Sequence, residues 1–430
     1  MGAERVRVAI IGAGPAGIAA ALELAEYGAA PLLLDEAPTP GGRMQSQIHP
    51  DPTRPGTWHN GASKVQDMLS RAAASGVRMR MQTEVWAIWR TEEAWHLTLG
   101  GPDAEPGESV DADTVLVATG AAQNGLPFPG WTLPGVLSAG AIQTMVYQFG
   151  VLPGRQLLVV GSDPLALAVA TELPRLGTKV VGVVLPPPGP AIGELASPAR
   201  AVSEVLRMSH LAPSAALRLL GRLPRAPLAR LAAHWFPRRG VRAGDARLLL
   251  RHCIVSAEGD DDVQGATLAL LDGSGRPIVG SERHVDLDAI CVAGGLFPLP
   301  ELVEATGLAA MAFVEELGGR IPLHGPDMQT TADGLFVAGS ATGVEPAEVA
   351  LAQGRLAGIG MARRLGLLSE TEAVTAISAA SASIKQARKL AWLSFYPNAD
   401  RGRERVAELW QASVSTAEVA SRRHMEAGLV

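Results

Sequence analysis

Three glycines and one acidic residue near the N-terminus have the spacing of a dinucleotide-binding site. Gly12, Gly14 and Gly17 follow the apolar run VRVAII at residues 6–11 and precede an Ala- and Leu-rich stretch that is typical of a helix. In this pattern the first glycine makes a tight turn, the second lets a pyrophosphate approach the backbone, and the third permits close packing of helix on strand. The helix N-terminus offers N–H groups and a positive dipole to the phosphates.

The acid that completes the pattern is Asp35, which lies 23 residues after Gly12 at the end of a second apolar run. A carboxylate at this distance can accept hydrogen bonds from the adenosine ribose, and the neighbouring Glu36 is the alternative. A glycine-rich turn in an unrelated βα unit is the competing interpretation, but strand, helix, second strand and acid together favour a nucleotide. We therefore expect nucleotide contacts from Gly12, Gly14, Pro15, Ala16, Gly17, Asp35 and Glu36.

A second stretch, GSDPLALAVA at residues 161–170, repeats the outline but has Asp163 where the second glycine would stand. A carboxylate there repels a pyrophosphate and fills the space that glycine leaves open. The next apolar run ends in Leu185 and Pro186, so it offers neither an acid for a ribose diol nor an arginine for a 2′-phosphate. We expect this segment to keep the fold of an NAD(P) site but not to bind NAD(P). A protonated or rotated Asp163 that bonds the ribose stays open as the alternative.

Further small-residue turns follow in a fixed order. They are TPGGRM at 39–44, VLVATG at 115–120 and GLFVAGS at 334–340, before an Ala- and Gly-rich helix that begins near Pro346. This order resembles the FAD-binding half of flavoproteins with two dinucleotide-binding domains, in which the second domain is inserted into the first. The resemblance implies an α/β fold of the glutathione and thioredoxin reductase type, doubly wound and Rossmann-like. The expected parts are an FAD-binding domain at 1–124 and 285–366, an inserted NAD(P)-binding-like domain at 125–284, and a helical C-terminal tail at 367–430.

The same resemblance implies roles for individual residues. Gly41, Gly42 and Arg43 would line the phosphate and ribityl region, and Ala118 to Gly120 would pass the adenosine side. Gly339 and Ser340 would approach the ribityl chain, and the helix after Pro346 would point its N-terminus at the pyrimidine edge of the flavin. The chain departs from the family in having Ser340 where an acid is usual, and Glu345 and Glu348 add negative charge at that helix start. The cofactor-binding residues implied downstream are Gly42, Arg43, Val85, Ala118, Thr119, Gly120, Gly339, Ser340 and Ala347.

A narrower resemblance lies in PFPGWTLPGV at 127–136, followed by SAGA at 138–141. With the runs at 286–307 and 328–343, this segment resembles the flavoprotein subunit shared by hydrogen cyanide synthase, the opine oxidases, dye-linked proline dehydrogenases and the alpha subunit of sarcosine oxidase. The resemblance implies a multisubunit amine or amino-acid dehydrogenase. In such an assembly a separate flavoprotein subunit oxidises the C–N bond, so the substrate would bind the partner. No residue of this chain is predicted to be catalytic.

Cysteine usage limits the other redox groups. Residues 367–430, where many of these subunits carry a [2Fe-2S] module, contain no cysteine, and Cys253 and Cys291 have no paired spacing. A cluster held by thiolates and a disulfide framework are therefore not expected. No His, Cys and carboxylate pattern has the spacing of metal ligands.

Composition and charge limit the partners and the cellular location that we expect for the protein. The formal net charge of −6 gives no reason to expect nucleic-acid binding. No run of about 18 apolar residues predicts a membrane span, and the first apolar run begins at Val6, so we expect a cytoplasmic protein. Nine arginines between Arg200 and Arg242 face a single acid, and the expected helical excursion at 191–240 is basic on one face. That face is a docking surface for a partner, a membrane-surface contact or an ordinary solvated face.

Three functions remain open from the sequence. The first is an FAD-binding subunit that relays electrons with a partner flavoprotein in a homo- or hetero-oligomer. The second is a free-standing NAD(P)H-dependent flavin reductase, against which Asp163 argues. The third is a non-catalytic scaffold subunit that holds FAD, ATP or another adenine nucleotide.

Overall fold

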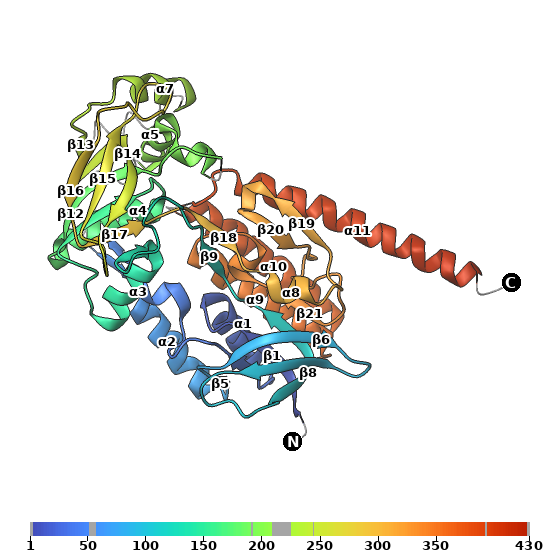
Figure 1. The fold of residues 1–430 in the computed structure, drawn as a ribbon. Coiled ribbons are helices and arrows are strands. Elements are labelled where there is room, and N and C mark those ends of the chain that lie inside the picture. Colours follow the sequence, from blue (N-terminus) through green and yellow to red (C-terminus); the bar gives the residue numbers. More distant parts are fainter. Residues whose placement is uncertain are drawn as a thin grey trace. The chain divides into compact units, whose positions relative to one another are not determined.

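The computed structural model describes residues 3–50, 57–190, 192–208, 225–243, 245–391 and 394–427. The chain divides into two compact units. One unit is built from Met1–His49, Trp58–Ala122 and Leu296–Val430, and the other is built mainly from Gln123–Gly295. Figure 1 shows the elements of both units along the sequence.

The first unit is organised around a seven-stranded sheet with the path β5-β2-β1-β8-β7-β6. Strand β8 serves two sub-sheets, because its first half pairs antiparallel with β7 and its second half pairs parallel with β21. The central strand β1 pairs parallel with both β2 and β8, and its last four residues are buried, as expected for a parallel strand covered on both faces. The strands are β1 (Glu4–Ile11), β2 (Leu32–Leu34), β5 (Arg78–Arg80), β6 (Glu84–Arg90), β7 (Trp95–Gly100), β8 (Ser109–Val117) and β21 (Leu335–Val337).

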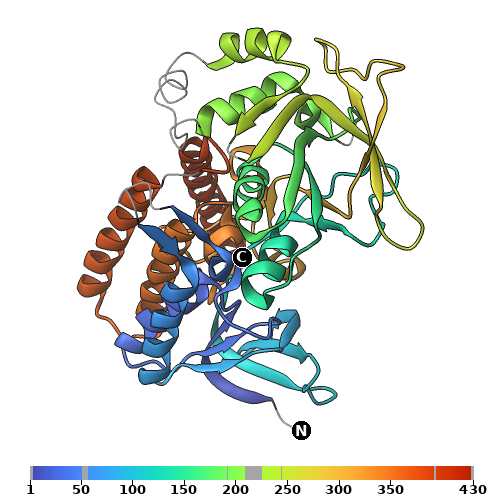
Figure 2. The same cartoon turned by 90° about the vertical axis from the view of Figure 1, so that its left-hand side faces the viewer.

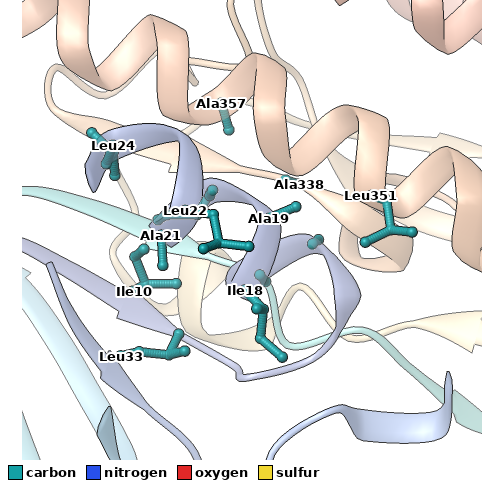
Figure 3. Close-up of a cluster of buried hydrophobic side chains, with 14 of the residues drawn as sticks. Ile10, Ile18, Ala19, Ala21, Leu22, Leu24, Leu33, Ala338, Leu351 and Ala357 are labelled. Atoms are coloured by element: carbon teal, nitrogen blue, oxygen red, sulfur yellow. The ribbon is translucent and has the colours of Figure 1, made fainter. Parts of the chain in front are cut away.

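Helices α1 (Pro15–Glu26) and α9 (Ala347–Arg364) pack against each other over one face of this sheet. The packing is close because both helices present small residues. A Cβ added at Gly354 would lie 2.1 Å from the carbonyl oxygen of Ala16, so only glycine fits there. Figure 3 shows Ile18, Leu22 and Leu351 in the hydrophobic cluster to which both helices and the sheet contribute. The two helices that the cofactor pattern predicts are therefore held in fixed register.

Smaller elements complete the first unit. Helix α10 packs against α9, and α11 packs against the hairpin of β19 and β20 through Val406, Leu409 and Trp410. The expected helical tail thus consists of two helices, with Pro397 between them. The remaining elements are η1 (Gly42–Ser46), β3 (Ile48–Pro50), β4 (Trp58–Asn60), α2 (Gly61–Ala74), β9 (Ala121–Gln123), β18 (Leu296–Pro298), α8 (Glu301–Ala305), β19 (Met311–Val314), η5 (Glu315–Leu317), β20 (Gly319–Pro322), η6 (Gly339–Thr342), α10 (Glu370–Leu390) and α11 (Ala399–Ala427).

The second unit repeats this plan with an eight-stranded sheet of path β10-β17-β11-β12-β14-β15-β16, with β13 paired to β14. Its first five strands are parallel and its last three form an antiparallel meander. The strands are β10 (Val136–Ser138), β11 (Gln156–Val160), β12 (Lys179–Leu185), β13 (Val241–Ala243), β14 (Ala246–Glu258), β15 (Gly265–Leu270), β16 (Arg283–Asp286) and β17 (Ala289–Val292). The helices are α3 (Ala139–Phe149), α4 (Pro164–Glu172), η2 (Leu173–Leu176), η3 (Gly193–Ala196), α5 (Pro198–Arg207) and α7 (Arg225–Trp235).

The basic segment at 191–240 is described only in part. Helices α5 and α7 lie beside each other in Figure 2 and bury Ala201, Val202, Ala229 and Ala233 in the same cluster as β14. Residues 209–224, with Arg218 and Arg222, lie outside the described residues. Part of the apolar surface of these helices is therefore buried in the core of the second unit, while Leu231 and Trp235 of α7 are exposed.

The Rossmann-like α/β fold with a second unit inserted into the first and a helical C-terminal region is confirmed. The return to the first unit falls at Leu296 instead of residue 285. Residue 285 lies within β16 and β17 follows it, and both strands pair within the second sheet. Among the described helices, none has the length and hydropathy needed to cross a membrane.

Candidate functional site

The turn between β1 and α1 forms the floor of the candidate site. Gly12 has φ +105°, and its N–H donates to the carbonyl oxygen of Leu34 at 2.8 Å. A Cβ at Gly12 would lie 2.4 Å from the carbonyl oxygen of Ala118, and one at Gly17 would lie 1.9 Å from that of Gly12. The first and third glycines are therefore required by backbone packing, as their spacing predicts.

Gly14 differs from Gly12 and Gly17, because no neighbouring atom excludes a side chain at its position. A Cβ added at Gly14 meets no heavy atom of the described residues within 4 Å, and φ is −75°, which any residue can adopt. Gly14 is the N-cap residue of α1, and Pro15 follows in the first turn. Within the described part of the chain, no side chain caps this helix and no acid lies in its first turn. The N–H groups of the helix N-terminus thus face open space that an anion can fill.

Asp35 ties the strand ends around this cradle together. Its carboxylate accepts the N–H of Ala13 at 2.6 Å and that of Ala37 at 2.8 Å. A carboxylate has about four acceptor positions, so two remain for ribose hydroxyls. Glu36 is exposed, in keeping with its place as the second choice.

The GG turn lies against the cradle. The Gly41 N–H donates to the carbonyl oxygen of Ala13 at 2.7 Å, and a Cβ at Gly42 would lie 3.2 Å from the Cα of Gly14. Both glycines have positive φ, +117° and +52°. The turn brings Gly42 to the open side of Gly14, while the Arg43 side chain is exposed.

The segment Ala118–Gly120 borders the same turn from the carboxyl end of β8. The Ala118 N–H donates to the carbonyl oxygen of Ile11 at 2.8 Å, and the Thr119 hydroxyl donates to that of Leu299 at 2.6 Å. Gly120 has φ +83°, and a Cβ there meets no described heavy atom within 4 Å. This segment therefore also presents open backbone beside the cradle.

Val85 belongs to the edge of the site near Asp35. The Thr83 N–H, two residues before it, donates to the Asp35 carbonyl oxygen at 2.9 Å. Val85 itself pairs with Leu99 in the sheet, and its side chain packs against the hydrophobic cluster there. A nucleotide contact at this position would therefore come from the backbone.

The start of α9 approaches the cradle from the C-terminal part of the unit. A Cβ at Gly339, which has φ +71°, would lie 2.9 Å from the Cβ of Ala16. The Gly339 N–H donates to Oε1 of the buried Gln353 at 2.9 Å. Ser340 and Ala347 are half-buried in the turn that follows and at the first residue of α9. Gly339, Ser340 and Ala347 thus belong to one turn next to the N-terminus of α1.

Gln353 is a site residue that the sequence patterns do not predict. It lies in an Ala- and Gly-rich helix, and its amide group bridges a backbone N–H and a carboxylate, because Oε1 accepts from the Gly339 N–H while Nε2 donates to the Glu345 side chain at 3.1 Å. The single amide of this Ala- and Gly-rich helix is the signal that could have marked it.

Charge at the start of α9 differs from the expectation. Glu345 is buried, at 8% exposed, and it forms ion pairs with Arg388 of α10 and Arg403 of α11. Burial alone raises the pKa of Glu345, but the two arginines outweigh it and hold the pKa below its ordinary value. The exposed Glu348 pairs with Lys64 at 2.7 Å. The expected excess of negative charge is therefore wrong, since each glutamate has a cationic partner.

The second copy of the turn is closed by its own side chain. Asp163 is the N-cap residue of α4, and its carboxylate accepts the N–H of Ala166 at 2.7 Å and that of Gly295 at 3.0 Å. Burial raises the pKa of Asp163, and these N–H donors act against that rise. Gly161 keeps the turn of Gly12, with φ +125° and its N–H bonded to the carbonyl oxygen of Val184. The two turns have similar backbones, but the first is open to a phosphate at Gly14 whereas the second holds the Asp163 carboxylate at that position.

No group of three or more His, Cys, Asp or Glu side chains in the described part of the chain could hold a metal ion. Cys253 and Cys291 are buried free thiols. Burial raises the pKa of Cys253 to about 11 and also raises that of Cys291. Both thiols are therefore protonated at neutral pH and belong to the core of the second unit.

Comparison with known proteins gives a consistent family. The family model described as pyridine nucleotide-disulphide oxidoreductase matches residues 6–204. An opine oxidase subunit of Rhizobium meliloti is 30% identical over 360 residues, which cover 83% of this chain and 71% of that protein. Hydrogen cyanide synthase subunit HcnB of Pseudomonas aeruginosa is 28% identical over 385 residues, which cover 86% and 73%.

A solved structure gives the same fold. The L-proline dehydrogenase of P. horikoshii superimposes with a TM-score of 0.62 at 20% identity. The match covers 90% of this chain and 60% of that one. The chain therefore belongs to the family of the opine oxidase subunit from Rhizobium meliloti, with a domain of the pyridine nucleotide-disulphide oxidoreductase type.

Proposed function

We propose that this chain is the FAD-binding subunit of a multisubunit oxidoreductase that oxidises the C–N bond of an amine or amino acid. Its family is one of FAD-dependent oxidoreductases, and the relatives are named as subunits. The observation that carries the proposal is the contrast between two like turns. The α1 N-terminus is open at Gly14, whereas the α4 N-terminus is occupied by the Asp163 carboxylate.

The first turn fits a dinucleotide along its length. The pyrophosphate would lie at Gly14 with the N-terminus of α1 and the GG turn around it. Asp35 would accept hydrogen bonds from the adenosine ribose, and the backbone near Val85 and Ala118 to Gly120 would border the adenosine side. The turn from Gly339 to Ala347 would border the flavin side. Bound FAD supplies two-electron transfer, and the protein supplies its position and electrostatic surroundings.

The closed second turn favours a partner subunit over NAD(P)H as the source of electrons. Its N–H donors are already bonded to Asp163, so NAD(P)H would have to displace a carboxylate and overcome its charge. We therefore assign substrate oxidation to a second flavoprotein subunit, with electrons passing between the subunits. The two buried free thiols are consistent with a reducing compartment, and we place the protein in the cytoplasm.

The test is purification of the tagged full-length chain from its native cells with its copurifying proteins. The complex would be mixed anaerobically in a stopped-flow spectrometer with an opine, L-proline, glycine or NADH. We expect a second flavoprotein in stoichiometric amount and flavin bleaching by an amino acid but not by NADH. A chain that purifies alone and whose flavin is bleached by NADH contradicts the proposal and favours the free-standing flavin reductase.

A further inference from the structure

Two arginines of the C-terminal tail reach the turn at residues 339–346, and the role inferred for them rests on the proposed FAD binding. Arg388 lies in α10 and Arg403 lies in α11. Both side chains are largely buried, at 18% and 11% exposed, and both end on the carboxylate of Glu345.

Arg403 holds the backbone of this turn as well as the acid. Its Nη1 donates to the carbonyl oxygen of Thr342 at 2.7 Å, and its Nε donates to Glu345 at 2.9 Å. Gln353 adds a bond to Glu345 from α9 at 3.1 Å. The turn is thus fixed from α9, α10 and α11 at once.

The turn lies next to the N-terminus of α1. Gly339 is packed on Ala16 in the first turn of α1, where the pyrophosphate would bind. A dinucleotide whose ribose is held at Asp35 and whose pyrophosphate lies at Gly14 must extend its other half towards this turn. The flavin is that half, so its surroundings include the residues that Arg403 fixes.

The cluster also carries charge. Two guanidinium groups and one carboxylate leave one net positive charge in a buried position, where screening by water is weak. The N-terminus of α9 adds its positive dipole end at the same place. Reduction adds negative charge to a flavin, so a positive surrounding favours the reduced form.

We propose that Arg388 and Arg403 make the C-terminal tail a positioning element of the flavin site, which orders the turn at 339–346 and raises the reduction potential of bound FAD. The tail then has a redox role without any cysteine.

The test measures the reduction potential and the FAD affinity of the full-length chain. Arg403→Met is expected to shift the ratio of reduced to oxidised FAD at least tenfold towards oxidised, against one reference dye, which is about 30 mV for a two-electron couple. Glu345→Gln is expected to shift the ratio in the opposite direction. Arg403→Lys keeps the charge and is expected to stay within threefold of wild type, which also covers the case in which the methionine variant does not fold.

Arg401→Met is the matched control, because Arg401 lies in the same helix and its side chain is 80% exposed. Its potential is expected to equal that of wild type. Unchanged potential and affinity in Arg403→Met, or shifts of the same sign in Arg403→Met and Glu345→Gln, overturn the inference while leaving the proposed function intact. A wild-type chain that takes up no flavin contradicts the proposed function, and this inference with it.

Discussion

Replacing Gly14 by aspartate would build into the first turn the carboxylate that closes the second. The position accepts the change, since a Cβ there meets no described heavy atom within 4 Å and φ is −75°. At an N-cap, glycine is only about a few tenths of a kcal/mol worse than aspartate. We therefore expect the apoprotein of Gly14→Asp to keep the thermal stability of wild type.

Binding of FAD should respond very differently. A carboxylate about 4 Å from a phosphate, at an effective dielectric constant of about 20, costs about 4 kcal/mol. This corresponds to a roughly thousand-fold weaker Kd. The new side chain would also accept from an N–H group of the helix N-terminus, as Asp163 accepts from the N–H of Ala166 in α4.

The assay is a fluorescence titration of apoprotein with FAD, alongside thermal unfolding followed by circular dichroism. Gly14→Asn is the control, because it has the same shape without the charge, and its loss of affinity should be clearly smaller. Binding of FAD by Gly14→Asp within threefold of wild type would refute the phosphate site at Gly14. A large loss of apoprotein stability would refute the claim that the space at Gly14 is open.

Three other predictions concern the second unit and the helix pair. Asp163→Gly should lower the free energy of unfolding by about 1–2 kcal/mol, chiefly because the Gly295 N–H loses its acceptor, while calorimetric titration should detect NADH binding that wild type lacks; a fully stable variant would contradict the structural role of the carboxylate. Burial raises the pKa of Glu172 to about 7, although the Tyr147 hydroxyl, which donates to its carboxylate at 2.9 Å, acts against that rise. Stability is therefore lost as pH rises from about 4.5 to 7, and Glu172→Gln should flatten the plot of melting temperature against pH in that window. An unchanged slope in this variant would contradict the prediction. Gly354→Ala should destabilise by about 2 kcal/mol or more, since its Cβ would meet a backbone oxygen of α1 at 2.1 Å, whereas Gly189→Ala, at an open position, should melt as wild type does.

The sequence predicts those parts of the fold that depend on local spacing. Gly12 and Gly161 are required by contacts with the end of a neighbouring strand and Gly17 by contact with its own turn, and such contacts recur wherever a strand, a tight turn and a helix follow each other. The difference between Gly14 and Asp163 is also visible in the sequence, because one side chain at one position decides whether the helix N-terminus is open.

The interactions that the sequence does not predict join residues far apart along the chain. Arg403 lies 58 residues from Glu345, and nothing local marks it among the other arginines of the tail. Its role depends on how α11 packs on the first unit, which hydrophobic periodicity does not specify. For the same reason the sequence predicts added negative charge at Glu345, although its two partners reverse the net charge around it.

Whether the first turn holds FAD is tested most directly by identifying the small molecule that the purified full-length chain carries. The visible spectrum of the protein and mass spectrometry of the ligand released on denaturation would be recorded on one sample. We expect flavin absorbance and the mass of FAD, near one equivalent per chain, both lost in Gly14→Asp. An adenine nucleotide without flavin would contradict FAD binding and favour a scaffold subunit, and an NAD(P) molecule retained by Gly14→Asp would contradict the closure of the second turn.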